Sequence, residues 1–270
     1  RLINFRLKQK HLRESILNSQ PNFRDLGGIR TKLGQKIKEN RIFRSGSFGK
    51  LDENDLSVLK GLGIGNIVDL RTSEEIELLD TENHPKTIEY YNVAINAGNI
   101  LKSLIPIFEK GEFGLIDSNV MNKIYFEVIT TFKSELALVY RAILNADTGI
   151  IYHCSQGKDR TGIISALLLD FFDVERDYIY MDYLKSNELL KRQNEYYIQL
   201  IKENFSKQFN REVSDEEFAP VKSLFYVREE NLKGVFDYID SESLSANNYF
   251  RFELGLTEAE LELLKSKYLE

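Results

Sequence analysis

The chain has 270 residues and a mass of 31.4 kDa, and its 42% hydrophobic and 29% charged residues are the balance of a globular protein with a substantial core. A net charge of −6 argues against nucleic-acid binding through bulk charge, so an anionic substrate would need a local positive site. The sequence has no run of about 18–20 apolar residues, which predicts no membrane span, and a single cysteine excludes a disulfide framework.

The organisation of the chain is simple. The segment Arg1–Arg6 carries charges where an export signal needs an apolar run, so a cytoplasmic location is the default expectation. The three histidines and the cysteine lie far apart, which predicts no zinc cluster. There is no repeat or linker composition, so residues 1–270 are predicted to form one domain. The sequence leaves the oligomeric state open, because it has no coiled-coil pattern.

Three β-rich runs occupy the first part of the chain. They predict a short strand at 41–44, a buried strand at 66–70 and a strand rich in aromatic and β-branched residues at 89–95. The run Gly61-Leu62-Gly63-Ile64-Gly65 precedes a strand instead of following one, so it does not indicate a dinucleotide-binding loop.

Helical patterns dominate the second part. Apolar residues at three- and four-residue spacing predict one long amphipathic helix over 124–143, and a buried strand is expected at 149–153. The run 163–172 is apolar nearly all round, which indicates a central buried helix. The segment 178–235 is helix-like, and capping-box spacings predict helices after Ser214 and Thr257. Together these elements predict an α/β fold with a mostly parallel central sheet flanked by helices.

The lone cysteine lies between the last predicted strand and the buried helix. The strand ends at His153 and the helix begins near Arg160, so the residues between them form a tight loop. Backbone amides of such a loop, together with the helix N-terminus, make an anion site that needs no metal. Gly157 permits a turn that a Cβ atom would hinder. The expected occupant is a phosphate or another oxyanion.

Phosphoryl transfer from a monoester follows from these residue types. The positive field favours the thiolate form of Cys154, which can attack phosphorus, and the Arg160 fork can bind two phosphoryl oxygens. Thr161 is expected to donate a hydrogen bond to the thiolate. A carboxylic acid must protonate the leaving oxygen and then activate water. Asp159 is the first choice for this role; Asp69, at the carboxyl end of a strand, is the second. Capping the buried helix is the competing role for Asp159, and orienting an arginine is the competing role for Asp69.

The segment from His153 to Gly162 resembles the signature loop of cysteine-dependent protein tyrosine phosphatases, in particular the atypical bacterial branch that acts on phosphotyrosine and phosphoinositides. Its Gly157-Lys158-Asp159 core is typical of that branch. Further similar motifs span the chain: Asn22-Phe23-Arg24-Asp25-Leu26-Gly27-Gly28, Phe43-Arg44-Ser45-Gly46, Asp69-Leu70-Arg71-Thr72 followed by Glu74-Glu75, Asp182-Tyr183-Leu184-x-Ser186-Asn187, and Leu254-Gly255-Leu256-Thr257.

The resemblance implies a phosphatase without metal or other cofactor, with Asp159 as general acid and with a helical lid at about residues 185–220. The expected substrate is a phosphotyrosine protein, with phosphoserine, phosphothreonine and phosphoinositides as further candidates. Lys158 would favour inositol substrates by adding a second cation. The departure from the family pattern lies at Ser155-Gln156, where Gln156 could narrow the pocket or add a hydrogen bond. The loop residues expected to bind substrate are Ser155, Gln156, Gly157, Lys158 and Thr161.

Two other functions are compatible with parts of the pattern. A non-catalytic phosphate-binding module would bind an anion without turnover, although Cys154, Asp159 and Arg160 are all present. A sulfur-transfer or arsenate-reducing enzyme would usually need further cysteines, which this chain does not have. The residues Arg24, Asp25, Arg44 and Arg71 are expected to form a buried ion-pair network that supports the loop, and His153 to shape it by packing.

Overall fold

The structure is a computed structural model of the whole chain, and it describes all residues except 1–16, 18, 49–50, 80–84 and 97. The N-terminal segment used to argue against an export signal lies outside the described residues, as do His11 and His84.

A mixed central sheet organises the described residues. Its order is β1-β2-β5-β3-β4. The strands β2, β5, β3 and β4 are parallel, and only β1 pairs antiparallel, with β2. The α/β architecture with a mostly parallel sheet is therefore confirmed. The strands are β1 (Arg24–Asp25), β2 (Ile42–Ser45), β3 (Ile64–Asp69), β4 (Glu89–Asn92) and β5 (Gly149–His153).

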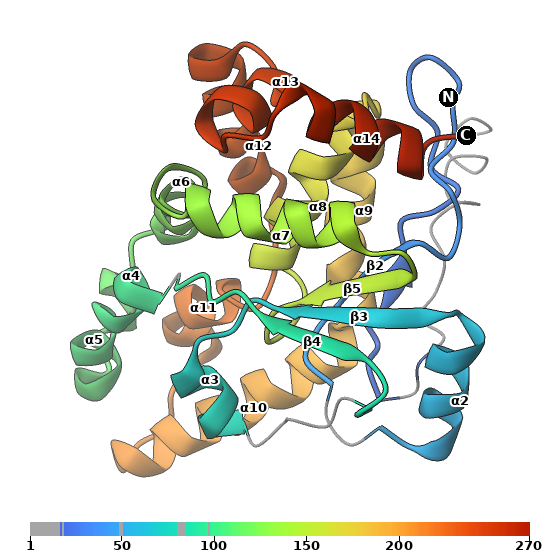
Figure 1. Ribbon diagram of the computed structural model, residues 1–270. Helices are drawn as coiled ribbons and strands as arrows, with labels where there is room; N and C mark the ends of the chain where they lie inside the picture. The colour runs from blue at the N-terminus through green and yellow to red at the C-terminus, as the bar shows by residue number, and fades with distance from the viewer. Residues whose placement is uncertain (1–16, 18, 49–50, 80–84, 97) are drawn as a thin grey trace, which may run out of the picture.

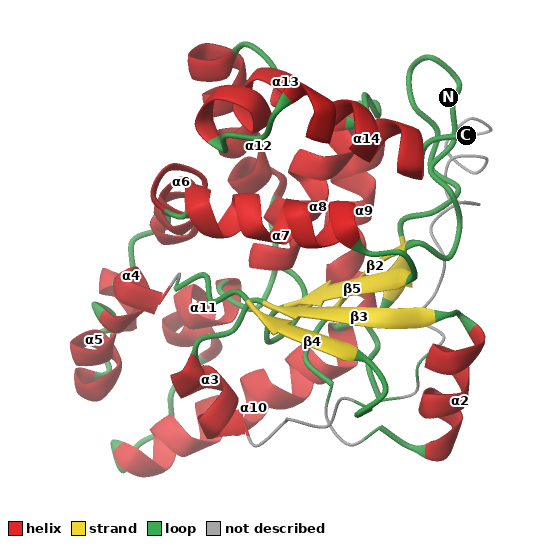
Figure 2. Ribbon diagram, in the orientation of Figure 1, coloured by secondary structure: helices red, strands yellow, loops and turns green. Residues whose placement is uncertain are grey.

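Helices cover both faces of this sheet (Figure 1; Figure 2). In chain order they are α2 (Glu53–Gly61), α3 (Ser73–Leu79), α4 (Gly98–Lys102), α5 (Ile105–Lys110), the 3₁₀ turn η1 (Phe113–Leu115), α6 (Val120–Thr131), α7 (Lys133–Asn145), α8 (Arg160–Phe171), α9 (Arg176–Leu189), α10 (Lys191–Gln208), α11 (Asp215–Ser223), α12 (Glu229–Tyr238), the π-turn η2 (Ile239–Ser243), α13 (Ala246–Asn248), the π-turn η3 (Tyr249–Glu253) and α14 (Glu258–Tyr268).

Two apolar cores lie on opposite faces of the sheet. Successive side chains of a strand point to opposite faces, and the buried residues follow this alternation. On β5, Ile150 and Tyr152 belong to the large core that also contains α8, whereas Ile151 belongs to a smaller core with Leu59 of α2. The helix α8 is buried almost all round, as its sequence predicts.

The predicted helix over 124–143 is wrong in one respect, because the chain forms two helices that meet at Phe132. The backbone of Phe132 leaves the helical region with φ −98° and ψ 35°. The two halves pack on different partners, α6 against α12 and α4, and α7 against α14. One straight helix could not keep both apolar faces buried.

The strand predicted over 89–95 is shorter than expected. It ends at Asn92, whose side-chain amide donates to the carbonyls of Asp69 and Arg71. The other predicted strands and the capped helices α11 and α14 form where expected, with Ser214 and Thr257 as N-caps. No helix among the described residues has the length and apolar character needed to cross a bilayer.

Candidate active site

The loop between β5 and α8 lies at the carboxyl ends of the parallel strands, where the sequence analysis expects it (Figure 1). Gly157 has a φ of +71°, and a Cβ atom there would lie 2.3 Å from the Ser45 carbonyl group. The loop can therefore curl tightly against β2 only with glycine at this position. None of the amides of residues 155–159 donates a hydrogen bond to another described residue. They are a set of donors available to an anion.

Arg160 is held on one side by Glu75 of α3. Its Nη1 and Nη2 atoms donate to the two carboxylate oxygens at 2.8 and 2.5 Å, and Nη1 also donates to the carbonyls of Leu70 and Ile95. Burial opposes the charge of Glu75, but the hydrogen bonds and charge of Arg160 lower the pKa of Glu75 to about 2. Burial likewise works against the cation, and the bond to Glu75 outweighs it and raises the pKa of Arg160.

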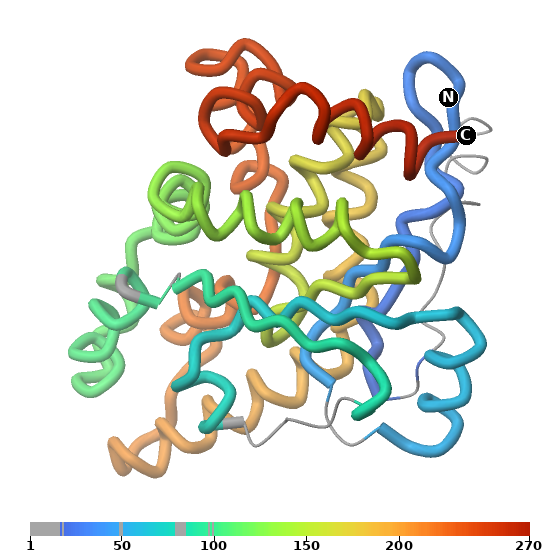
Figure 3. The backbone as a smooth tube through the Cα atoms, viewed as in Figure 1, coloured from blue at the N-terminus to red at the C-terminus, as the bar shows by residue number. Residues whose placement is uncertain are grey.

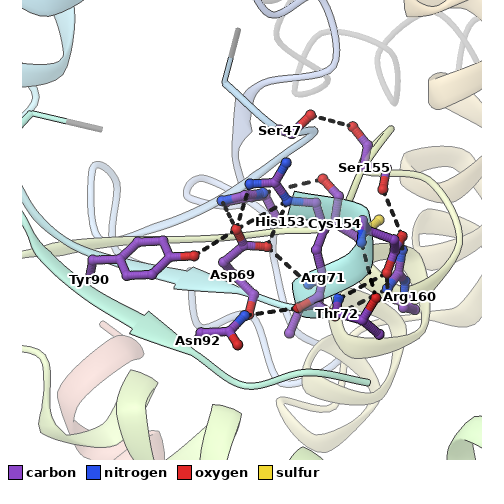
Figure 4. A network of polar contacts seen from close by, with 12 residues as sticks. Ser47, Asp69, Arg71, Thr72, Tyr90, Asn92, His153, Cys154, Ser155 and Arg160 are labelled. Atoms are coloured by element: carbon purple, nitrogen blue, oxygen red, sulfur yellow. Dashed lines mark hydrogen bonds and ion pairs between the residues drawn. The ribbon is translucent and has the colours of Figure 1, made fainter. Parts of the chain in front are cut away.

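This pairing leaves a defined part of the guanidinium available. A guanidinium has five N–H groups, and both on Nη1 and one on Nη2 are engaged by the contacts above. Within the described part of the chain, Nε and the second Nη2 hydrogen make no hydrogen bond. These two donors point in parallel, which is the geometry that matches two oxygens of one phosphoryl group. Figure 4 shows the Arg160 side chain beside the Cys154 sulfur at the end of β5.

Cys154 is 3% exposed. The next residue, Ser155, is hydrogen-bonded to Glu75 and to Ser47. The Ser155 hydroxyl donates to Glu75 at 2.9 Å, and its carbonyl accepts from the amide and hydroxyl of Ser47. Glu75 therefore connects Arg160 to the loop as well as to α3 (Figure 4 shows the Ser47, Ser155 and Arg160 side chains).

Asp159 is the N-cap residue of α8 but its side chain makes no capping hydrogen bond. Its Oδ1 atom instead accepts a hydrogen bond from the Tyr125 hydroxyl at 2.8 Å. Its Oδ2 atom lies 3.7 Å from the Lys158 ammonium, and the side chain is 25% exposed. The capping role weighed against the acid role is thus not the one this carboxylate takes.

Asp69 lies in a different environment. Its side chain is fully buried and both of its oxygens bind the Arg71 guanidinium, while Oδ2 also accepts from the Tyr90 hydroxyl (Figure 4). Burial works against its charge, but the bonds from Arg71 lower the pKa of Asp69. It orients an arginine, as the competing interpretation held, and that arginine is Arg71.

A buried ion-pair cluster supports the loop from below. Asp182 of α9 binds Arg24 at 2.6 Å and Arg44 at 2.5 Å, and all three side chains are at most 3% exposed. Arg44 also donates to the Gly157 carbonyl at 2.9 Å, and Asn22 donates to the Gln156 carbonyl at 2.9 Å. The expected network for Arg24 and Arg44 is confirmed. Asp25 uses its carboxylate to accept the amides of Gly27 and Asn40.

The remaining loop side chains contact α10 and the turn that follows α11. The Lys158 ammonium donates to the Leu224 carbonyl at 2.6 Å. The Gln156 amide lies 3.5 Å from Asn194 of α10, and Asn194 in turn donates to the Phe225 carbonyl at 2.9 Å. In the tube of Figure 3, residues 191–223 (orange) pass the carboxyl ends of the strands, which agrees with these contacts.

The side chains of Thr161 and His153 differ in their contacts. The expected hydrogen bond from Thr161 to the thiolate is absent: its buried hydroxyl has no partner among the described residues. His153 packs edge-on against Phe48, and its Nδ1 atom lies 3.2 Å from the Cys154 carbonyl. Burial lowers the pKa of His153, so the ring is neutral at pH 7.

A cavity of about 350 Å³ opens beside Asp159, Arg160 and Glu75. Its other walls are largely apolar and come from α4, α5, α6 and α8, among them Leu101, Ile105, Met121, Ile124, Val128 and Ile163. Among the described residues, no group of three or more His, Cys, Asp or Glu side chains is arranged to hold a metal ion.

In the sequence Glu75 stands out only as part of a motif, and Tyr125 and Asn194 belong to none of the motifs. The Thr72–Glu75 spacing predicts a capping box, and Glu75 does accept from the Thr72 amide while its own amide donates to the Thr72 hydroxyl. Its second role toward Arg160 joins positions 85 residues apart. Nothing in local spacing could indicate that contact.

Comparisons with known proteins identify the family of the chain. Residues 16–270 match the Tyrosine phosphatase family. The triple specificity protein phosphatase PtpB of Mycobacterium tuberculosis is 27% identical over 271 residues, covering 92% of this chain and 96% of that protein. A tyrosine-protein phosphatase of Nostoc commune is 27% identical over 159 residues, covering 58% of this chain and 52% of that protein. The crystal structure of TpbA from P. aeruginosa aligns with 56% of this chain and 71% of its own, at 12% identity and a TM-score of 0.33. The chain belongs to the tyrosine phosphatase family.

Proposed function

We propose that this phosphatase hydrolyses aryl phosphate monoesters, with phosphotyrosine as the principal substrate, through a phosphocysteine intermediate on Cys154. One observation carries the proposal: the amides of residues 155–159 and two N–H groups of Arg160, which have no hydrogen-bond partner among the described residues, belong to the loop that holds the single cysteine at the end of β5. Such a set of fixed donors stabilises the charge of a phosphoryl group in transfer.

The first step forms a bond between the Cys154 sulfur and phosphorus and breaks the bond from phosphorus to the leaving oxygen. Asp159 gives its proton to that oxygen, so the product leaves as a phenol or alcohol. In the second step Asp159 takes a proton from water, the water oxygen attacks phosphorus, and the thiolate departs as inorganic phosphate forms. Arg160 and the loop amides bind the equatorial oxygens in both steps.

Asp159 suits the acid role better than Asp69. Asp159 borders the cavity and is partly exposed, whereas Asp69 is sealed in the core with both oxygens bound to Arg71. A group that exchanges a proton with substrate must reach it within hydrogen-bond distance. The apolar walls beside Asp159 and Arg160 support an aromatic leaving group, because a phenyl ring placed there would keep its phenolic oxygen near the acid.

Lys158 supports phosphoinositides as a second substrate class. Its ammonium lies inside the loop beside Asp159 and could bind a second phosphate after exchanging the Leu224 carbonyl for it. The name of the mycobacterial relative states three specificities, which agrees with a broad substrate range. The segment at about 185–220, within one domain of residues 1–270, is proposed as the lid, since Asn194 of this segment accepts from the Gln156 amide of the loop.

The test is hydrolysis of p-nitrophenyl phosphate and of a phosphotyrosine peptide by the wild type and by Cys154→Ser. Activity in EDTA with the wild type, and none with Cys154→Ser, is expected. Full activity in Cys154→Ser would remove the cysteine from its role. Anion binding by the wild type without turnover would instead identify a phosphate-binding module. Phosphotyrosine peptides and phosphoinositides compared at equal concentration decide between the two substrate classes.

A further inference from the structure

Two buried tyrosine hydroxyls form a chain of hydrogen bonds that ends at Asp159. Tyr125 comes from α6 and Tyr183 from α9, and each residue is 1% exposed. The Tyr125 hydroxyl lies 2.8 Å from Asp159 Oδ1 and 2.7 Å from the Tyr183 hydroxyl. Burying polar hydroxyls is costly unless they are hydrogen-bonded, and these two are bonded to each other and to one carboxylate.

The direction of this chain of hydrogen bonds follows from donor counting. An ionised carboxylate only accepts, so Tyr125 must give its single hydrogen to Asp159. In the contact between the two hydroxyls Tyr125 is then the acceptor and Tyr183 the donor. Burial raises the pKa of both phenols well above the ordinary value of 10, so both keep their hydrogens over the pH range of a phosphatase.

We propose that Tyr125 is a positioning residue for the general acid: it holds Oδ1 of Asp159, so that the transferred proton resides on Oδ2. A protonated carboxyl group carries its hydrogen on one oxygen, and Oδ1 is occupied as an acceptor. In the described part of the chain Oδ2 has no hydrogen bond. This inference rests on the acid role of Asp159 proposed above.

Two cations interact with the Asp159 carboxylate. Lys158 lies 3.7 Å from Oδ2, and Arg160 interacts with the same carboxylate while it is bound to Glu75. The Tyr125 hydroxyl donates to the other oxygen of this carboxylate, Oδ1. Removing the Tyr125 hydroxyl therefore has two separable effects: the carboxyl group loses its fixed orientation, and its proton becomes harder to remove.

The test compares kcat/KM for aryl phosphates with good and poor leaving groups, because protonation matters only for the poor ones. Tyr125→Phe is expected to lower kcat/KM for phenyl phosphate, which has a poor leaving group, about tenfold or more, because a hydrogen bond to a charged group is lost. The kcat/KM for dinitrophenyl phosphate, which has a good leaving group, should stay nearly unchanged. The basic limb of its pH profile should also move to higher pH. Tyr183→Phe removes the neighbouring hydroxyl from the same cluster, keeps the Tyr125–Asp159 bond, and should retain the leaving-group dependence of the wild type.

Asp159→Asn separates this inference from the proposed function. If Asp159→Asn slows esters with good and poor leaving groups equally, the acid role of Asp159 is wrong. If Asp159→Asn slows the poor leaving groups more, but Tyr125→Phe slows all substrates equally or none, the positioning role of Tyr125 is overturned. In the Asp159→Asn background Tyr125→Phe should add nothing. Should Tyr125→Phe fail to fold, 3-fluorotyrosine at position 125 keeps the ring and strengthens the donor, and the basic limb must then move to lower pH; an unmoved limb contradicts the inference.

Discussion

Arg160 illustrates how one side chain serves two partners at the residue scale. Glu75 and two carbonyls bind one edge of the guanidinium, and the other edge keeps two parallel donors. The cost of burying the cation is offset by a full negative charge on Glu75, whose pKa is held near 2. The arginine is thereby fixed in position before substrate arrives, and fixed donors need no rearrangement in the transition state.

Glu75→Gln tests this positioning. The amide keeps the size of the side chain but presents one donor where Arg160 needs an acceptor, so the guanidinium loses its orientation. We expect kcat/KM to fall at least about tenfold, equivalent to roughly 1.4 kcal/mol of transition-state stabilisation. Glu77→Gln, an exposed change on the same helix, is the control and should keep wild-type activity. Equal activity of the two variants would contradict the role of Glu75.

The depressed pKa of Glu75 also predicts a pH dependence of stability. The carboxyl group has a pKa of about 2 in the folded chain against an ordinary value of 4.5. Its contribution is fully present above pH 4.5 and is lost as pH falls toward 2, because the unfolded chain binds the proton first. The free energies of unfolding of wild type and Glu75→Gln, measured by urea titration from pH 7 to 3, should converge below pH 4.5. A constant difference would show that the charge of Glu75 does not stabilise the fold.

At the scale of elements, the helices α14 and α8 differ in how their first turns are capped. The helix α14 begins with a capping box, in which the Thr257 hydroxyl accepts from the Glu260 amide and the Glu260 carboxylate accepts from the Thr257 amide. The helix α8 starts without such a cap, because its N-cap carboxylate is bound by Tyr125. Spacing alone predicts the first arrangement and cannot predict the second.

Thr257→Ala measures how much the N-cap of α14 contributes to the free energy of unfolding. Losing the hydroxyl acceptor should lower the free energy of unfolding by about 1 kcal/mol, since α14 carries Leu261, Leu264 and Tyr268 into the core. Thr257→Ser retains the acceptor and should cost less than about half of that amount. Urea denaturation of both variants decides the matter; a serine variant as unstable as the alanine variant would mean that the methyl group, not the cap, stabilises the helix.

At the scale of the whole molecule, the buried cluster of Arg24, Arg44 and Asp182 joins the first strands to α9 beneath the catalytic loop. Two guanidiniums share one carboxylate, and burial together with the neighbouring Arg44 lowers the pKa of Arg24 to about 10. Although burial opposes its charge, the two arginines lower the pKa of Asp182. The cluster connects residues 158 positions apart, so its formation depends on the complete fold.

Asp182→Asn should therefore destabilise the protein strongly. It leaves two buried guanidiniums without a counter-charge, which costs about 3–5 kcal/mol in the free energy of unfolding. Asp240→Asn is the matched control, because Asp240 pairs with Arg176 at a half-exposed position and should cost less than about 1 kcal/mol. Chemical denaturation measures the free energy of unfolding of both variants. Similar decreases for the two would rule out a special role for the buried cluster.

The sequence by itself determined the α/β class, most strands, the buried helix α8, the capped helices α11 and α14, and the loop that carries the cysteine. These features follow from periodicity, turn residues and capping spacings, which act over a few residues. Only the tertiary structure decided that the predicted helix over 124–143 divides at Phe132, that Asp159 is bound by Tyr125, and that Glu75 holds Arg160. Such pairings depend on which faces of distant elements pack together, since buried charges and hydroxyls take whichever partner the packing brings within hydrogen-bond distance.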